Sequence, residues 1–200
     1  MKFVFLGDVH GNMQHCLHVA QTNTRAVIVQ VGDMGVGFRE LKDISVLDLL
    51  PPNFKFFVGN HDNRQLANTS SVCLGDFGEY LEKIFFVSGA NSIDKEDRIE
   101  GISWWADEEL SYKQGVDCLD LWEKSQTKIL VSHDCPQSIA EGYKDIYDKS
   151  STRSLLQQMI EVRKPEMIVC GHHHYSHRLI HDGIQYIGLD INEAFLLDIL

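Results

Sequence analysis

Short runs of apolar residues, rich in valine, isoleucine and phenylalanine, recur along the chain. Most are continuous and do not alternate with polar residues, which is typical of strands that are buried on both faces of a sheet. They lie at residues 3–6, 26–31, 54–58, 84–87, 129–131 and 167–169. We predict one strand from each run.

Helical patterns lie between some of these runs. Asn12 can cap a helix that continues to about Gln21. Ser150 or Ser151 can cap a second helix, whose apolar stripe ends before Pro165. Because strands and helices alternate, the chain is predicted to form layers of the α/β class.

The last part of the chain has a different pattern. Asp182 and Gly183 separate two stretches of strand-forming residues, which predicts a hairpin, and the run "AFLLDIL" can add a final strand. We therefore expect antiparallel pairs there. Since no repeat, low-complexity tract or linker interrupts the sequence, we expect a single domain over residues 1–200.

Composition and charge narrow the classes of partner. Hydrophobic residues make up 44% of the 200 residues and charged residues 24%, as in an ordinary globular protein. The net charge is -11 and no dense run of lysine or arginine occurs. We therefore expect neither long duplex nucleic acid nor a membrane as a partner, while the oligomeric state stays open.

The cysteines and the N-terminal residues bear on location. The five cysteines are widely spaced and form no Cys-x-x-Cys pair, which favours reduced thiols in a cytoplasmic protein. The apolar run in "MKFVFLGDVHGN" is too short for a signal peptide or a membrane span. We expect it to form the first strand of a cytoplasmic protein.

Five of the predicted strands are followed by side chains that can bind metal ions, four times directly after a glycine. These side chains are Asp8 and His10, Asp33, Asn60 with His61 and Asp62, His133 with Asp134, and His172 with His173 and His174. In α/β proteins, ligand sites form outside the carboxyl ends of the strands. We therefore expect these side chains to meet in one site.

The chemistry of this set favours two metal ions. Three adjacent histidines would repel one another if all were protonated, whereas a bound cation can hold imidazoles neutral. Carboxylates, an asparagine and several imidazoles are too many ligands for one tetrahedral zinc ion. Two adjacent divalent or trivalent ions can activate a water molecule and bind the oxygens of a phosphorus centre. The set therefore predicts hydrolysis of a phosphate ester by metal-activated water.

The order of these residues resembles the five-block signature of the calcineurin-like metallophosphoesterases. The blocks are Asp8-Val9-His10, Gly32-Asp33, Gly59-Asn60-His61-Asp62, His133 and Gly171-His172-His173-His174. The resemblance implies a four-layer αββα sandwich, in which two mixed β-sheets are flanked by helices and the metals lie at one edge. It also implies two metal ions per chain, for which we expect manganese, with iron, zinc, nickel or cobalt as alternatives.

The resemblance also implies a role for each matching residue. Asp33 matches the carboxylate that bridges the two ions. The ligands of one metal are then Asp8, His10 and His174, and those of the other are Asn60, His133 and His172. His173 occupies the variable position of its block and is not counted as a ligand.

Two catalytic residues follow from the same blocks. His61 resembles the histidine that contacts the substrate and helps the leaving group to depart, and Asp62 would orient and polarise its imidazole. We expect Asn60, His61 and Arg64 to bind the substrate. Arg39 is a weaker candidate for neutralising a substrate phosphate.

Several substrate classes stay open. The protein-phosphatase branch of the family has an arginine where this chain has Val58, so we favour phosphodiesters over monoesters, with a phosphomonoesterase or phosphoprotein phosphatase as the alternative. The expected partner is a small phosphate ester, such as a nucleotide. A non-catalytic protein-binding scaffold is a further alternative. Trp104 and Trp105 could pack in the core or form a wall for a nucleobase, and Cys135 is expected to be a packed thiol and not a nucleophile.

Overall fold

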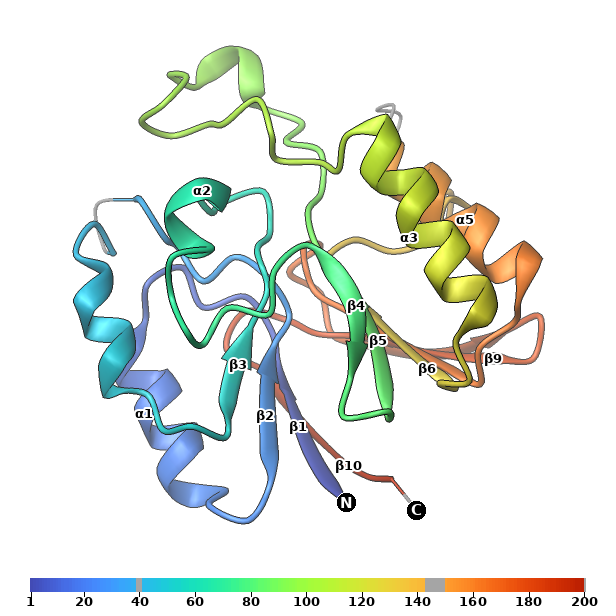
Figure 1. Ribbon diagram of the computed structural model, residues 1–200, viewed down its shortest axis with the longest axis horizontal. Coiled ribbons are helices and arrows are strands. Elements are labelled where there is room, and N and C mark those ends of the chain that lie inside the picture. The colour runs from blue at the N-terminus through green and yellow to red at the C-terminus, as the bar shows by residue number, and fades with distance from the viewer. Residues whose placement is uncertain (39–40, 143–149, 200) are drawn as a thin grey trace.

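The computed structural model describes residues 1–38, 41–142 and 150–199 (Figure 1). One of its two sheets has the strand order β10-β1-β2-β3. These strands are β1 (Lys2–Leu6), β2 (Val27–Gln30), β3 (Phe54–Phe56) and β10 (Ala194–Asp198). β1, β2 and β3 run parallel, and β10 pairs antiparallel with β1.

The other sheet has the strand order β4-β5-β6-β7-β9-β8. Its strands are β4 (Phe77–Tyr80), β5 (Ile84–Val87), β6 (Ile129–Ser132), β7 (Met167–Cys170), β8 (His177–His181) and β9 (Ile184–Gly188). The four inner strands are parallel, and the two edge strands are antiparallel to their neighbours. The predicted hairpin is the one that joins β8 to β9.

Alternate residues of the strands face two different apolar layers. On β1, Phe3 and Phe5 lie in the layer between the two sheets, whereas Val4 and Leu6 belong to the layer under the helices. Both sets are buried. Since each inner strand has a core on both faces, its sequence is apolar throughout, which is why the runs do not alternate with polar residues.

Helices cover the outer faces of both sheets, which completes the four predicted layers (Figure 1). The four-stranded sheet is covered by α1 (Met13–Thr22), with the 3-10 helix Ile44–Leu49 and α2 (Arg64–Ala67) nearby. The six-stranded sheet is covered by α3 (Tyr112–Lys124), α4 (Gln137–Ala140) and α5 (Ser151–Val162). The prediction of an αββα sandwich with two mixed sheets is confirmed.

The predicted helix caps are also present. The Asn12 side chain accepts a hydrogen bond from the backbone N–H of His15, and that of Ser150 accepts one from Arg153. The sequence analysis missed β4 and the helices α2, α3 and α4. α3 begins with a capping box of Ser111 and Gln114 but buries only Cys118 and Trp122, so its apolar stripe is narrow.

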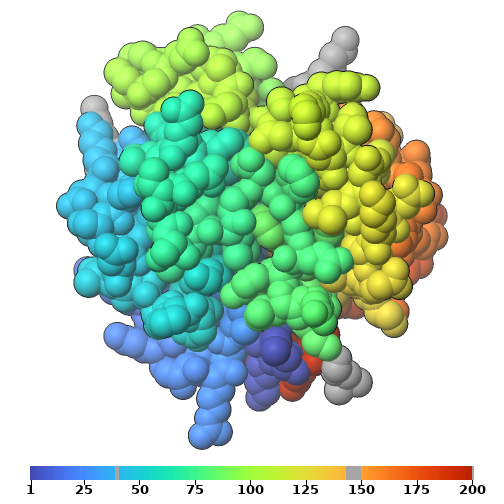
Figure 2. All heavy atoms as spheres, viewed as in Figure 1, coloured from blue at the N-terminus to red at the C-terminus, as the bar shows by residue number. Residues whose placement is uncertain are grey.

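A long segment without regular strands, residues 89–111, connects β5 to α3. It holds the short 3-10 helix Lys95–Asp97 and arches over the carboxyl ends of the strands, in light green at the top of Figure 1. In Figure 2 its atoms lie directly above those around α2. We call it the 89–111 segment.

In the described parts of the chain, no helix is both long and apolar enough to cross a membrane. The five cysteines are free thiols. Arg39, the weaker candidate for phosphate binding, lies outside the described residues.

Candidate metal centre

The predicted ligands follow parallel strands of both sheets and lie at one edge of the sandwich. Asp8 follows β1, Asp33 follows β2 and Asn60 follows β3, all in the four-stranded sheet. His133 follows β6 and His172 follows β7, both in the six-stranded sheet. Since the carboxyl ends of these strands meet at the same edge, residues far apart in the sequence converge there.

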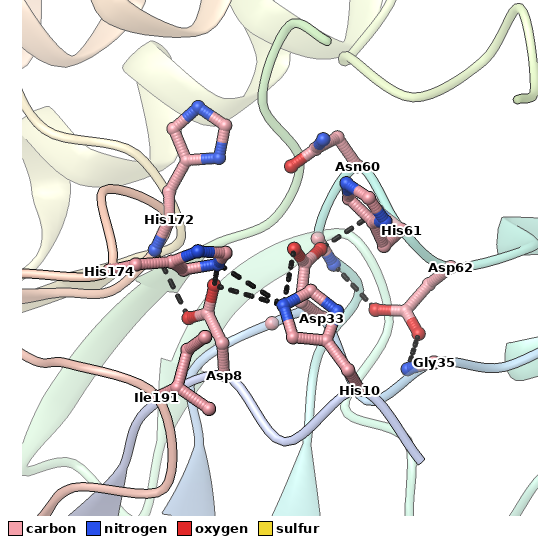
Figure 3. Close-up of polar contacts among 12 residues, drawn as sticks. Asp8, His10, Asp33, Gly35, Asn60, His61, Asp62, His172, His174 and Ile191 are labelled. Carbon is pink, nitrogen blue, oxygen red and sulfur yellow. Dashed lines mark hydrogen bonds and ion pairs between the residues drawn. The ribbon is translucent and has the colours of Figure 1, made fainter. Parts of the chain in front are cut away.

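One group of donor atoms belongs to Asp8, His10, Asp33 and His174. All of these atoms lie within 4.8 Å of one another. The Nε2 atom of His174 lies 3.0 Å from Asp8 Oδ2 and 3.1 Å from His10 Nε2 (Figure 3). The carboxylates are buried, whereas His174 is exposed, so the group opens to solvent on one side. Oxygen and imidazole donors of this kind suit a divalent cation.

A second group surrounds His133, which is fully buried. Its Nε2 atom lies 3.1 Å from both Asp33 Oδ1 and Asn60 Oδ1. Its Nδ1 atom lies 2.9 Å from the carbonyl oxygen of Val31, which can only accept, so Nδ1 carries a proton and Nε2 faces the site. The ring of His172 lies 5.0 Å from that of His133, between centroids, and points away from Asp8 in Figure 3.

Asp33 lies between the two groups. Its Oδ2 atom is 3.9 Å from His10 Nε2, and its Oδ1 atom is on the side of His133. Burial disfavours charge on both residues, yet their mutual attraction raises the pKa of His133 to about 10 and holds the pKa of Asp33 well below its usual range. The carboxylates therefore favour positive charge at this place, which a metal ion would supply.

The backbone of four predicted ligands is strained. His10, Asp33, His172 and His174 have φ angles of 43°, 57°, 67° and 50°, in the left-handed region. This conformation costs a residue other than glycine about 1–2 kcal/mol. Strained residues of this kind gather at functional sites, because a sharp turn after the strand aims the side chain into the site.

Steric constraints explain why glycines precede two of the predicted ligands. A Cβ atom on Gly59 would overlap Asp33 Oδ1, and one on Gly171 would overlap Asp8 Oδ1. Two buried carboxylates therefore pack directly on the glycine backbone of neighbouring strand ends. A larger residue at either position would displace a predicted ligand.

Residues 1–176 match the family model that is described as calcineurin-like phosphoesterase. This match covers most of the chain, including all of the residues in the two donor groups. The chain belongs to the calcineurin-like phosphoesterase family. The family consists of metal-dependent phosphoesterases and implies a centre of two metal ions, for which the two groups are the candidate ligands.

Two solved structures with a similar fold are distant from this chain in sequence. A Staphylococcus aureus protein assigned as a 5'-nucleotidase, solved with alpha-ketoglutarate, has a TM-score of 0.55 and 11% identity. The match covers 98% of this chain and 50% of that chain, so this chain spans about half of that protein's length. GAP50, described as the anchor in the inner membrane complex of Plasmodium, has a TM-score of 0.53 and 12% identity, covering 95% of this chain and 71% of that chain. None of the curated proteins matches the chain.

Asp62 has a different role from the predicted one. Its buried carboxylate accepts hydrogen bonds from the backbone N–H groups of Met34, Gly35, Val36 and Gly59, at 2.7–3.1 Å. These bonds take the place of the expected bond to the His61 imidazole. Asp62 therefore holds the loop after β2 against the turn after β3.

Arg64 also differs from its prediction as a substrate-binding residue. Its guanidinium is buried and contacts Asp76, the hydroxyl of Ser88, and the carbonyl oxygens of Asp107 and Glu108. The donors are thus directed at internal acceptors. Arg64 fixes the end of the 89–111 segment to α2.

The surroundings of His61 include Phe38 and Arg98, which the sequence analysis missed, and Trp105, which it named. Phe38 stacks on the His61 ring at 5.2 Å between centroids, and Trp105 packs edge-on against Phe38 at 5.1 Å. Arg98 Nη2 lies 2.8 Å from His61 Nε2. Burial lowers the pKa of His61, as does Arg98, while Asp33 opposes the change. Phe38 is therefore the aromatic residue that stacks on His61, and Trp105 packs against Phe38.

Asn60 is oriented by two further residues of the 89–111 segment. Its Nδ2 atom donates to the hydroxyl of Ser92 at 3.0 Å, which leaves Oδ1 directed at His133. Glu108 in turn accepts from the Ser92 hydroxyl at 2.5 Å and from its backbone N–H at 3.0 Å. Neither Ser92 nor Glu108 directly follows an apolar run or a glycine, so the pattern that marks the ligands does not mark these two residues.

A third group of donors, Asp134, Cys135 and His173, lies behind the ligands. Arg153 Nε lies 2.8 Å from Asp134 Oδ2, and His173 Nε2 lies 3.0 Å from Oδ1. Burial opposes the charge of Asp134, yet His172, His173 and Arg153 hold its pKa well below its usual range. Burial also raises the pKa of the Cys135 thiol well above its usual value, as expected for a packed thiol. This group is an internal ion-pair network.

We predict that Ser92→Ala weakens metal binding. The substitution removes the acceptor that fixes the Asn60 amide, and losing such an orienting contact typically costs about ten- to a hundredfold in metal affinity. Manganese titration of the purified variant, followed by metal analysis, measures the change. Ser71→Ala, at an exposed serine, is the control and should bind as the natural protein does. Equal affinity of the two variants would contradict an orienting role for Ser92.

Proposed function

We propose that this chain hydrolyses small phosphate esters with two metal ions, and that phosphodiesters are preferred over monoesters. Asp8, His10 and His174 would hold one ion, Asn60, His133 and His172 the other, and Asp33 both. The observation that carries this proposal is the place of Asp33, whose two carboxylate oxygens face His10 and His133.

The donor atoms fit such ions. They are carboxylate oxygens, an amide oxygen and imidazole nitrogens, a set that suits manganese, iron, zinc, nickel or cobalt, and we expect manganese. When bound, two ions lower the pKa of water and neutralise the charge of the phosphoryl oxygens.

His61 is proposed to donate a proton to the leaving group. Its ring lies 5.1 Å from that of His10, between centroids, and so borders the first donor group. Its backbone N–H donates to Asp33 Oδ1 at 2.8 Å, which fixes the residue relative to the proposed bridging carboxylate. An imidazole in this position can act as a general acid.

The surroundings of the centre support a small substrate. A cavity of about 240 Å³ is lined by His10, Gly35, Phe38 and His61. The face of Phe38 can pack against an aryl or nucleobase group. The preference for diesters rests on Val58, which is fully buried at the position where the protein-phosphatase branch has an arginine.

A phosphomonoesterase is the second candidate, and the fold neighbour that is assigned as a 5'-nucleotidase favours it. The scaffold alternative gains some support from the neighbour that is described as an anchor. Against it, no predicted ligand is missing from the sequence, and the donor atoms of Asp8, His10, Asp33 and His174 lie within 4.8 Å of one another. We expect the reaction to take place in the cytoplasm, because all five cysteines are free thiols.

We predict that, with manganese present, kcat/KM for aryl diesters and cyclic nucleotides exceeds that for phosphoserine peptides. A hydrolysis panel that also includes aryl monoesters tests this order. If monoesters are the best substrates, the second candidate function is correct. If no ester is hydrolysed while two metals are bound, the chain is a scaffold.

We predict that Asp33→Asn is the most damaging ligand substitution, because one carboxylate is proposed to serve both ions. Metal content per chain and kcat should both fall. Metal analysis beside the hydrolysis assay measures the two effects. Asp48→Asn, at an exposed carboxylate, is the matched control. A variant that kept two metals and near-normal hydrolysis would show that Asp33 does not bridge them.

We predict that His61→Ala keeps its metals and loses most of its activity on alkyl and nucleoside esters. General acid assistance contributes about a hundredfold to ten-thousandfold, and a nitrophenolate needs it far less than an alkoxide. kcat for both ester types, with metal content, measures the effect, and exposed His18→Ala is the control. Equal losses on the two ester types would favour a positioning role instead.

A further inference from the structure

Among the described residues of the 89–111 segment, only Arg98 has a cationic group in contact with His61, the proposed proton donor. Its Nη2 atom lies 2.8 Å from Nε2 of His61, and its Nη1 atom lies 3.5 Å from Nδ1. The side chain is only 13% exposed, so the guanidinium is directed at the imidazole and not at water.

The segment itself aims this guanidinium. Asp94 Oδ1 lies 2.8 Å from Arg98 Nη2, and Nη1 donates to the carbonyl oxygen of Ser103 at 3.3 Å. Both partners belong to the same segment, whose end is fixed to α2 by Arg64. Asp94 and Ser103 therefore fix the guanidinium of Arg98 in contact with His61.

The contact places the N–H donors of Arg98 beside the imidazole of His61. A guanidinium has five N–H donors in a planar fork and no acceptor. An anion bound next to His61 can therefore accept hydrogen bonds from Arg98. Guanidinium groups bind phosphate oxygens with two parallel hydrogen bonds, and these charge-assisted bonds are among the strongest in proteins.

We propose that Arg98 binds a non-bridging oxygen of the substrate phosphoryl group on the side of the leaving group, next to His61. This inference rests on the proposed function, since it takes the same site as the place of hydrolysis. Arg98 thus has the role that the sequence analysis gave to Arg64. The binding step breaks no covalent bond and transfers no proton.

Orthophosphate is a suitable probe because it carries the same oxygens as the substrate and can be titrated without any turnover. The variants are Arg98→Met, which keeps the aliphatic length, and Arg98→Lys, which keeps the charge but loses the planar fork. Lys95→Met is the matched control, because it removes an exposed cation from the same segment. Each manganese-loaded protein is titrated with orthophosphate by calorimetry, and its metal content and thermal unfolding are measured.

Arg98→Met should weaken orthophosphate binding about ten- to a hundredfold, the usual effect of losing a hydrogen bond to a charged group. Arg98→Lys should lose less, and Lys95→Met should stay within about twofold of the natural protein, since exposed charges are screened. Metal content should not change. If Arg98→Met lowered the unfolding temperature, the comparison would rest on Arg98→Lys, which should still bind phosphate more weakly than Lys95→Met.

Three outcomes would overturn the proposal. Orthophosphate affinity of Arg98→Met and Arg98→Lys within twofold of the control would show that Arg98 does not bind phosphate. Unchanged affinity with a lower kcat for alkyl esters would show that Arg98 only positions His61. Loss of metal from Arg98→Met would assign it to the metal centre. If instead the natural protein hydrolysed no ester but bound orthophosphate through Arg98, the proposed function would fail and the binding role would stand.

Discussion

The buried carboxylate of Asp62 is the interaction on which the arrangement of the site depends. It accepts four backbone N–H groups, three from the loop after β2 and one from the turn after β3. The first loop carries Asp33, and the second carries Asn60 and His61. Burial and the nearby Asp33 raise the pKa of Asp62 to about 7, against the effect of the backbone donors. A cation near Asp33 would offset part of this repulsion, so ligand geometry and metal binding support each other.

Close packing at the strand ends imposes a second constraint. Gly59 and Gly171 allow the carboxylates of Asp33 and Asp8 to lie directly on the neighbouring backbone. His10 and Asp33 turn sharply in the left-handed region, at a cost that the surrounding core must offset. That core is the layer between the two sheets, where Phe3 and other apolar side chains are fully buried. The positions of the side chains in the site are therefore fixed by the rigid strands that end there.

Much of the fold and of the candidate site could be predicted because the relevant signals are local. An inner strand with a core on both of its faces is apolar throughout. Most of the proposed ligands come shortly after such a strand, often directly after a glycine. The prediction for Arg64 used closeness in sequence to His61, yet its side chain turns toward the 89–111 segment. Arg98 is 37 positions from His61 and still contacts it. Such contacts depend on how the 89–111 segment folds back over the strand ends. The periodicity of apolar residues in the sequence carries no information about this.

The two parts of the site therefore have different physical origins. The strand ends fix the proposed metal ligands, and their geometry follows from the sheets that all αββα sandwiches share. The side where the leaving group would depart is formed by loops, namely Phe38 after β2 and Arg98 in the 89–111 segment. Loops tolerate sequence change far better than buried strands do, so this side can differ widely among relatives with the same metal centre. Ser92 and Glu108 connect the two parts, because the segment that carries Arg98 also orients Asn60. A movement of the 89–111 segment would then shift Arg98 and Asn60 together.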